Sequence, residues 1–147
     1  MISWNVNGIR AVEKKGFLEY IKKESPDILC IQETKAHKEQ LSETLTQIPG
    51  YHSYFSSGEK KGYSGVLCYT KEKPLSVHTG FDGHKKFDSE GRILILEFKN
   101  FILMNIYFPN GKASEERLKY KLEFYEEFLK YCKKHTKQLI ICGDINT

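Results

Sequence analysis

Several features that would assign this chain to a class are missing from its sequence. No uncharged apolar run approaches the ~20 residues that a membrane-spanning helix needs. The start, MISWNVNGIR, has no apolar stretch followed by a small-residue cleavage site. We therefore expect no membrane partner and a cytoplasmic protein. No HExxH, HxH or zinc-finger spacing occurs among the histidines, so no zinc site is expected at His37, His52, His78, His84 or His135.

Cysteine pairs of the CxxC kind are also missing. The four cysteines are Cys30, Cys68, Cys132 and Cys142, and the first and last lie inside the apolar runs DILCIQ and LIICGD. A buried free cysteine behaves as a small apolar residue. We therefore predict buried, reduced thiols at these positions.

Neither sign of charge dominates. Charged residues make up 29% of the chain, the net charge is +4 and the isoelectric point is about 8.8. This balance permits a polyanionic partner without requiring one. With 147 residues, of which 39% are hydrophobic, the chain can bury a core, and we expect residues 1–147 to belong to one domain.

Short apolar runs alternate with helical patterns along the chain. Strands are predicted at 2–6, 28–32, 64–70, 92–98, 101–108 and 138–142. Two short helical patterns, at 17–21 and 41–48, are each ended by a proline. The longest helix is predicted to begin after Ser114, and its apolar face is expected to consist of Leu118, Leu122, Tyr125, Leu129 and Cys132. The order of these elements predicts a layered α/β domain.

Polar side chains follow four of the predicted strands. They are Asn5 and Asn7, Glu33, Asn110, and Asp144 with Asn146. Taken singly, each motif has a purely structural explanation as a turn or a cap, since Asn, Asp, Pro and Gly are common turn residues. Strand ends that share one sheet edge can converge on one site. The occurrence of all four together therefore favours a functional site.

Carboxylate and amide oxygens in such a cluster suit a hard metal ion. Mg²⁺ binds through a few such ligands, keeps several waters and accepts phosphate oxygens from a substrate. Asp144 could then orient or deprotonate a water, while Asn146 holds that water or a non-bridging oxygen. The reaction class that this chemistry indicates is phosphodiester hydrolysis.

Six blocks of the sequence resemble one known family. SWNVNGIRA, PDILCIQETK, KKGYSGV, DSEGR, NIYFPNG with RLKYK, and ICGDIN occur in the order and at about the spacing of the exonuclease III family of apurinic/apyrimidinic endonucleases. The resemblance covers the whole chain. It implies a DNase I-like four-layer α/β/β/α sandwich, with two sheets packed face to face and the site at one edge. This chain would supply about the first half of that fold.

The resemblance also implies roles for individual residues. The metal, Mg²⁺ or Mn²⁺ in its place, would be held by Asn5 and Glu33, with help from Asp144 and Asn146. Catalytic roles would fall to Tyr107 at the scissile phosphate, Asp144 at the attacking water and Asn146 in the transition state. Asn7, Tyr63, Asn110 and Arg117 would lie at the DNA. Tyr107 can also be read as a plain strand aromatic, and Arg117 as a surface residue of a helix.

Part of the family pattern is absent from residues 1–147. The later blocks carry an aspartate that pairs with the catalytic histidine and a further aspartate–histidine pair, and no histidine of this sequence lies in a matching motif. We expect the domain to be truncated after the GDIN motif, with its second sheet mostly missing. The chain alone is then predicted to be inactive or nearly so. An exposed apolar face would invite self-association.

Three functions follow from this reading. The first is a Mg²⁺-dependent DNA-repair nuclease that cleaves double-stranded DNA 5′ to abasic sites and removes 3′-terminal nucleotides or blocks. The second is a phosphatase of the same superfamily, against which the KKGYSG and YFPNG–RLKYK blocks argue. The third is an inactive DNA-binding or complementation fragment.

Overall fold

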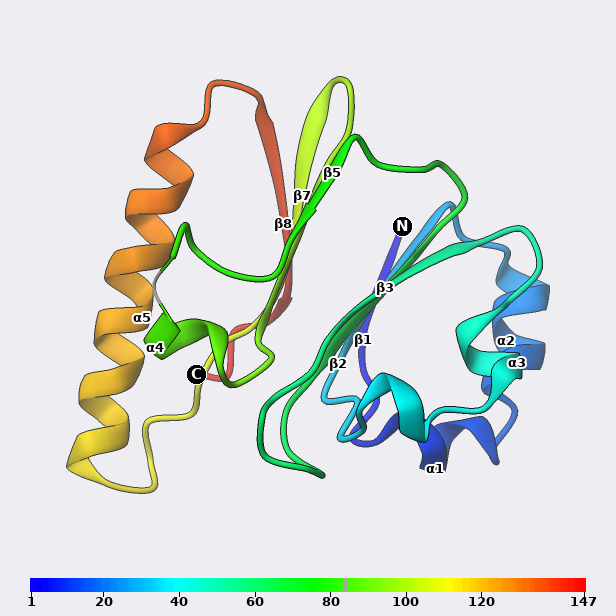
Figure 1. The fold of residues 1–147 in the computed structure, drawn as a ribbon, viewed down its shortest axis with the longest axis horizontal. Coiled ribbons are helices and arrows are strands. Elements are labelled where there is room, and N and C mark those ends of the chain that lie inside the picture. Colours follow the sequence, from blue (N-terminus) through cyan, green and yellow to red (C-terminus); the bar gives the residue numbers. More distant parts are fainter. Residues whose placement is uncertain (84) are drawn as a thin grey trace.

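The computed structural model describes residues 1–83 and 85–147, so His84 lies outside the described residues. These residues form two four-stranded sheets that pack face to face, with helices on both outer sides (Figure 1). The order in the first sheet is β1-β2-β4-β3, built from β1 (Ile2–Asn5), β2 (Ile28–Gln32), β3 (His52–Ser56) and β4 (Val66–Thr70). The order in the second is β5-β6-β7-β8, built from β5 (Ser76–His78), β6 (Ile93–Glu97), β7 (Phe101–Tyr107) and β8 (Gln138–Asp144).

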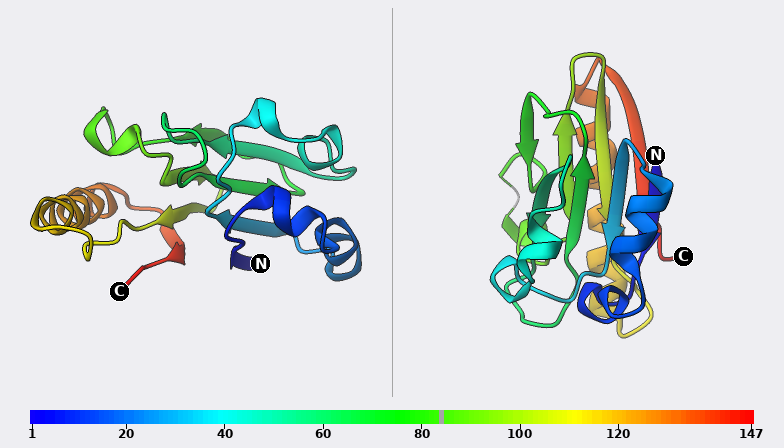
Figure 2. Two further views of the ribbon diagram at one scale, coloured as in Figure 1. Left: turned by 90° about the horizontal axis from the view of Figure 1, so that it is seen from below. Right: turned by 90° about the vertical axis from the view of Figure 1, so that its right-hand side faces the viewer.

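The helices complete a four-layer α/β/β/α arrangement, which confirms the predicted fold class (Figure 2). The first sheet is covered by α1 (Ile9–Glu13), α2 (Phe17–Glu24), the 3₁₀ helix η1 (Lys38–Gln40) and α3 (Glu43–Thr46). The second is covered by α4 (Lys85–Asp88) and α5 (Glu115–Lys134). No helix within the described residues has the length and apolarity to cross a membrane.

Each sheet contains one parallel pair at its edge. β1 pairs with β2 and β7 pairs with β8 in parallel, whereas the remaining pairs are antiparallel. A parallel pair needs a long crossover connection, which α1 and α2 supply in the first sheet and α5 supplies in the second. Each sheet therefore presents the carboxyl ends of two neighbouring parallel strands.

The core divides into layers because side chains alternate along each strand. On β7, Ile102, Met104 and Ile106 pack toward α5 and its aromatic residues. Leu103 faces the opposite way, into the layer between the sheets, which also contains Cys30, Val66, Cys68, Leu94, Leu96 and Phe98. A third layer lies beneath α1, α2 and α3.

A pair of buried amides joins the two sheets inside this apolar layer. The Gln32 side chain donates a hydrogen bond to Asn105 Oδ1 at 2.8 Å, and both residues are almost fully buried. Asn105 in turn donates from Nδ2 to the carbonyl oxygens of Ile31 and Leu67, both at 3.2 Å. A polar pair in this position stabilises one alignment of the sheets, because any other alignment leaves the amides unpaired.

All six predicted strands are confirmed, but two further strands were missed. β3 and β5 are edge strands whose sequences, HSYFS and SVH, are short and largely polar. They are stabilised by pairing with β4 and β6 rather than by an apolar pattern of their own. The pattern at 41–48 forms only the four-residue α3, although Leu41 and Ile48 still pack against the same core.

The predicted apolar face of α5 is wrong for its three leucines, although Tyr125 and Cys132 do pack against the core beneath the helix. Leu118, Leu122 and Leu129 are 48%, 53% and 53% exposed. The face that packs on the second sheet carries Tyr120, Phe124 and Tyr131 instead, because aromatic side chains bury more apolar surface than leucine.

Two more expectations are corrected by the structure. The second sheet is not mostly missing, since it has four strands, although Ile140 and Ile141 on β8 are 36% and 47% exposed. All four cysteines are free thiols, as predicted, but Cys132 and Cys142 are only half-buried.

The buried amide pair makes a prediction about stability. Asn105→Leu removes the shortest hydrogen bond of the Gln32 amide and leaves the carbonyl oxygens of Ile31 and Leu67 without the Asn105 donor, so the free energy of unfolding should fall by about 2 kcal/mol. Urea unfolding followed by circular dichroism measures this. The double variant Gln32→Leu/Asn105→Leu should lose less than the two single variants together, and strict additivity would show that the pair does not couple the sheets.

Candidate active site

Four polar side chains from four strand ends meet at one end of the two sheets. Asn5 ends β1, Glu33 follows β2, Tyr107 ends β7 and Asp144 ends β8. The Asn5 amide nitrogen donates to Glu33 Oε1 at 3.0 Å and to Asp144 Oδ2 at 2.7 Å. The Tyr107 hydroxyl donates to Glu33 Oε1 at 2.7 Å. Each sheet supplies two of these groups, so the strand ends converge at one end of the two packed sheets rather than within a single sheet.

The backbone at these strand ends is bent in ways that place the carboxylates. Glu33 has a φ of 54°, which turns the chain directly after β2. Gly143 has a φ of 135°, and a Cβ there would lie 1.9 Å from the carbonyl oxygen of Ile106 on β7. Glycine is therefore required before Asp144, so that β8 can lie against β7 and present the carboxylate at its end.

The electrostatics of the cluster keep its groups in definite protonation states. Burial acts to raise the pKa of Glu33, but hydrogen bonds from Asn5 and Tyr107 and the charge of Lys35 outweigh it and hold the pKa below its ordinary value. The Lys35 ammonium lies 3.5 Å from Glu33 Oε2. Burial, followed by the bond to Glu33, raises the pKa of Tyr107 well above its usual range. Glu33 is therefore an anion and Tyr107 a neutral donor.

The donor set of this cluster fits a hard divalent cation. The carboxylates of Glu33 and Asp144 both accept hydrogen bonds from the side-chain nitrogen of Asn5. The side-chain oxygen of Asn5 accepts a hydrogen bond from the backbone N–H of Asn7 at 3.0 Å. Within the described part of the chain, no three His, Cys, Asp or Glu side chains gather at one point. Two carboxylates supplemented by amide, water and phosphate oxygens suit Mg²⁺.

Asn146 and Asn7, both predicted for this site, border the cluster. The backbone of Asn146 donates to Asp144 Oδ1 at 2.9 Å, and its side chain donates to the carbonyl oxygen of Phe108 at 3.1 Å. The Asn7 side chain accepts from Lys35. Asn146 therefore orients one oxygen of Asp144, and Asn7 fixes the Asn5 amide.

A second polar network lies beside the cluster and holds two of the residues predicted to face DNA. Tyr63 accepts from the Arg92 guanidinium at 2.7 Å, and Arg117 donates twice to Glu90, at 2.8 and 3.1 Å. Arg92 binds the same carboxylate at 2.6 Å. The Arg92 guanidinium also lies 4.8 Å from the ring centre of Tyr107, which joins this network to the cluster.

Arg92 and Glu90 were not predicted as site residues. Both belong to the DSEGR block. The sequence feature that could have identified Arg92 is its position directly before the apolar run of β6. Asn110, in contrast, lies apart from both networks. It is exposed, and its side chain accepts from the backbone of Lys112 at 2.8 Å, as in an ordinary turn.

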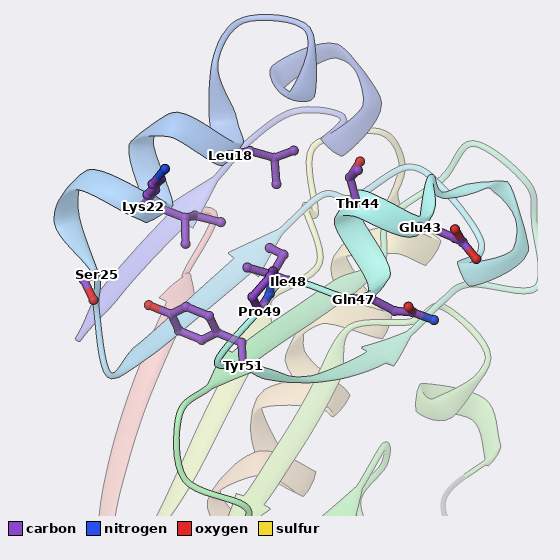
Figure 3. A pocket seen from close by; sticks show the side chains of 10 residues that line it. Leu18, Lys22, Ser25, Glu43, Thr44, Gln47, Ile48, Pro49 and Tyr51 are labelled. Atoms are coloured by element: carbon purple, nitrogen blue, oxygen red, sulfur yellow. The ribbon is translucent and has the colours of Figure 1, made fainter.

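A separate pocket of about 720 Å³ lies between α2 and the segment around α3 (Figure 3). Its wall is largely apolar, and the picture shows Leu18, Ile48, Pro49 and the Tyr51 ring around it. Glu43 is its one carboxylate, so it lacks the paired carboxylates found at the strand-end cluster. None of the predicted site residues lines this pocket.

Comparison with known proteins points in the same direction as the cluster. The model of the endonuclease/exonuclease/phosphatase family matches residues 2–147. The exodeoxyribonuclease of Bacillus subtilis (strain 168) is 43% identical over 149 residues, which are 99% of this chain and 58% of that protein. The DNA repair nuclease APEX1 of Danio rerio is 43% identical over 148 residues, or 98% of this chain and 47% of that protein. The chain thus spans about half the length of the curated relatives it matches.

Solved structures agree with this relationship. An AP endonuclease from Archaeoglobus fulgidus superimposes with a TM-score of 0.85 at 32% identity, over 99% of this chain and 57% of that one. The 3′ phosphatase NExo from Neisseria, solved with a product DNA hairpin, gives a TM-score of 0.84 at 26% identity, again over 99% and 57%.

The Glu90 network makes a prediction about pH. Burial acts to raise the pKa of Glu90, but hydrogen bonds from Arg117 and Arg92 outweigh it and hold the pKa below its ordinary value of 4.5. A lowered pKa means that the stabilisation is complete above about pH 4.5 and is lost as the pH falls through the lower, folded-state pKa. Glu90→Gln should therefore lower the free energy of unfolding by about 2 kcal/mol near pH 7 and by much less near pH 3.

The matched control is Glu59→Gln, an exposed carboxylate on the neighbouring loop. Its effect on urea unfolding should be small at both pH values. An equal loss in Glu90→Gln at both pH values would show that the charge of Glu90 is not what stabilises the network.

Proposed function

The chain belongs to the endonuclease/exonuclease/phosphatase family, and on that premise we propose that it is the amino-terminal part of a Mg²⁺-dependent DNA-repair nuclease. The activity would be that of an exodeoxyribonuclease III or AP endonuclease, acting on double-stranded DNA 5′ to abasic sites or at 3′ ends. The observation that carries the proposal is the meeting of Glu33 and Asp144 around the Asn5 amide, with the Tyr107 hydroxyl beside them.

Each group of the cluster has a role in phosphodiester hydrolysis. Glu33 would hold Mg²⁺, and Asn5 would join it once its amide turns to present the oxygen that here accepts from the backbone of Asn7. Mg²⁺, when bound, supplies positive charge to a phosphate oxygen. One oxygen of Asp144 accepts a hydrogen bond from Asn5, and the other accepts one from the backbone of Asn146. These bonds hold the carboxylate in the fixed orientation that a general base needs to take a proton from water. Tyr107 keeps its proton, because its pKa is raised, and can donate a hydrogen bond to the phosphate.

The neighbouring network supports a DNA-facing loop. Arg92 and Arg117 both donate to the hydroxyl of Tyr63, and the charge of Arg117 is balanced by Glu90. We propose that Arg117 acts mainly by holding Tyr63 for contact with the sugar–phosphate backbone. Asn7 and Asn110 would add polar contacts, and nearby lysines such as Lys60 and Lys112 would add sequence-independent attraction to phosphates.

We propose further that this chain needs residues it does not contain. Its relatives are about twice as long, and no histidine within the described residues contacts the cluster. A nuclease also needs a group that stabilises the leaving oxygen or the charge on the phosphate. The chain alone would then bind DNA or a complementing half with little or no turnover.

A phosphatase acting on DNA 3′ ends is a second candidate. It is supported by the likeness to the Neisseria 3′ phosphatase, whose structure contains a DNA hairpin. The same cluster would serve both reactions, since each is attack of water on a phosphorus atom.

The proposed nuclease is tested by nicking of a duplex that carries one abasic-site analogue. We expect no Mg²⁺-dependent cleavage by the chain alone, and cleavage when the carboxyl-terminal half of the Bacillus subtilis exodeoxyribonuclease is added. In the complemented assay, Asp144→Ala should lower the rate by about 1,000-fold, because it removes the proton acceptor.

Asp27→Ala, at a carboxylate that is 89% exposed and away from the cluster, is the matched control and should leave the rate unchanged. Cleavage by the chain alone that is lost in Asp144→Ala would show that residues 1–147 hold a working site. An absence of cleavage in either assay, with DNA still bound, would favour the binding fragment.

Metal binding can be measured without turnover. The chain should bind Mn²⁺, used as a paramagnetic substitute for Mg²⁺, and Glu33→Gln should weaken binding by about tenfold or more because it removes a charged ligand. Electron paramagnetic resonance of free Mn²⁺ during titration reports the affinity. The control is Glu24→Gln at an exposed position, and equal affinities in the two variants would place the metal elsewhere.

A further inference from the structure

α5 has an apolar stripe that the fold covers only in part. Leu118, Leu122 and Leu129 are about half exposed, whereas Tyr125 between them is half-buried, with its ring centre 5.4 Å from that of Phe108. Figure 1 shows α5 at the outer side of the molecule, with the second sheet on one side of it, and Figure 2 shows the same arrangement in two other views. Among the described residues, no element lies over the outer side of the helix.

This surface is more than scattered exposed leucines. Its four residues are spaced by four, three and four positions, which is the seam of a coiled coil rather than the wider face of a surface helix. The helix already buries Tyr120, Phe124 and Tyr131 against the sheet, so the fold does not need a second apolar stripe. An exposed stripe of this kind marks an interaction surface.

We propose that this stripe, made of Leu118, Leu122, Tyr125 and Leu129, is a self-association surface on which α5 of a second copy packs in antiparallel orientation. The intervals between these residues, four, three and four positions, are the same in both directions along the helix. A two-fold axis at its centre therefore places Leu118 against the partner's Leu129, and Leu122 against the partner's Tyr125. Such a self-complementary patch is what a symmetric dimer requires.

The charges on α5 favour the same arrangement. The first turn carries Glu115 and Glu116, and the last turn carries Lys133 and Lys134. In an antiparallel pair, the acidic end of each helix lies beside the basic end of the other, and the helix dipoles oppose each other favourably. A parallel pair would bring like charges together at both ends.

One pair of exposed charges beside the stripe adds specificity. Lys119 and Glu126 are seven residues apart and thus lie on the same side of the helix. The two-fold axis brings Lys119 of one copy near the partner's Glu126, and the reverse contact forms at the other end. Among residues 1–83 and 85–147, Lys119 pairs with Glu123 at 4.0 Å, the limit of an ion pair. The second copy therefore offers Lys119 and Glu126 partners of opposite charge.

The surface is small, so the dimer is weak. A helix pair of this length buries less than the roughly 1,200 Å² of a standard interface. We expect a dissociation constant on the order of 10–100 µM. Sedimentation velocity over a range of concentrations should show a monomer that converts reversibly to a dimer.

Leu122→Glu places a charge at the centre of the stripe and should weaken the dimer at least about tenfold. Leu75→Glu is the matched control, because Leu75 is also exposed, at 69%, but lies beside β5. Circular dichroism confirms that both variants fold. A wild-type chain that stays monomeric at all concentrations overturns the proposal. So does a dimer that persists in Leu122→Glu and is lost in Ile141→Glu, because β8 is then the contact.

A charge exchange tests the antiparallel orientation. Lys119→Glu and Glu126→Lys should each weaken the dimer, since each variant sets like charges against each other across the two-fold axis. The double variant should restore the original affinity. If the double variant is as weak as the single ones, the antiparallel arrangement is wrong.

Discussion

The contact between the two sheets determines how the polar groups of the candidate site lie relative to one another. Asn5 and Glu33 belong to the first sheet, whereas Tyr107 and Asp144 belong to the second, and the hydrogen bonds among them form only in one alignment of the sheets. Apolar packing between the sheets is non-directional and does not define that alignment by itself. The buried amides of Gln32 and Asn105 do, because they precede Glu33 by one residue and Tyr107 by two.

Around this contact, each group of the cluster has hydrogen-bond or ring partners that hold it in place. Asn5 is held by Glu33, Asp144 and Asn7, and the Tyr107 ring lies against the Arg92 guanidinium, which is itself fixed by Glu90. Groups whose partners are already satisfied lose little further entropy when a substrate binds. The structure thus joins a carboxylate cluster to the Tyr63 loop through Arg92, although the two come from different blocks of the sequence.

Six of the strands and the polar groups at their ends could be predicted from the sequence, because apolar runs that end in Asn, Glu or Gly-Asp are local features. The two short edge strands could not, because HSYFS and SVH are extended only by virtue of their neighbours. The role of Arg92 also could not be predicted. Its burial depends on Glu90, Tyr63 and Tyr107 arriving from three segments, and no pattern within one segment encodes that.

α5 shows how a correct element can be given the wrong face. The leucines at 118, 122 and 129 have the helical spacing that ordinarily marks a core, yet Tyr120, Phe124 and Tyr131 have an equally regular spacing on another side. Helical periodicity alone does not show which of the two stripes is buried. The aromatic stripe packs on the sheet because its side chains bury more apolar surface than the leucines would. The leucine stripe stays exposed, and exposed leucine lowers solubility unless another surface covers it. A helix that carries an exposed leucine stripe beside its packed aromatic face has a reason for both stripes if, as proposed above, a second copy packs on the leucines.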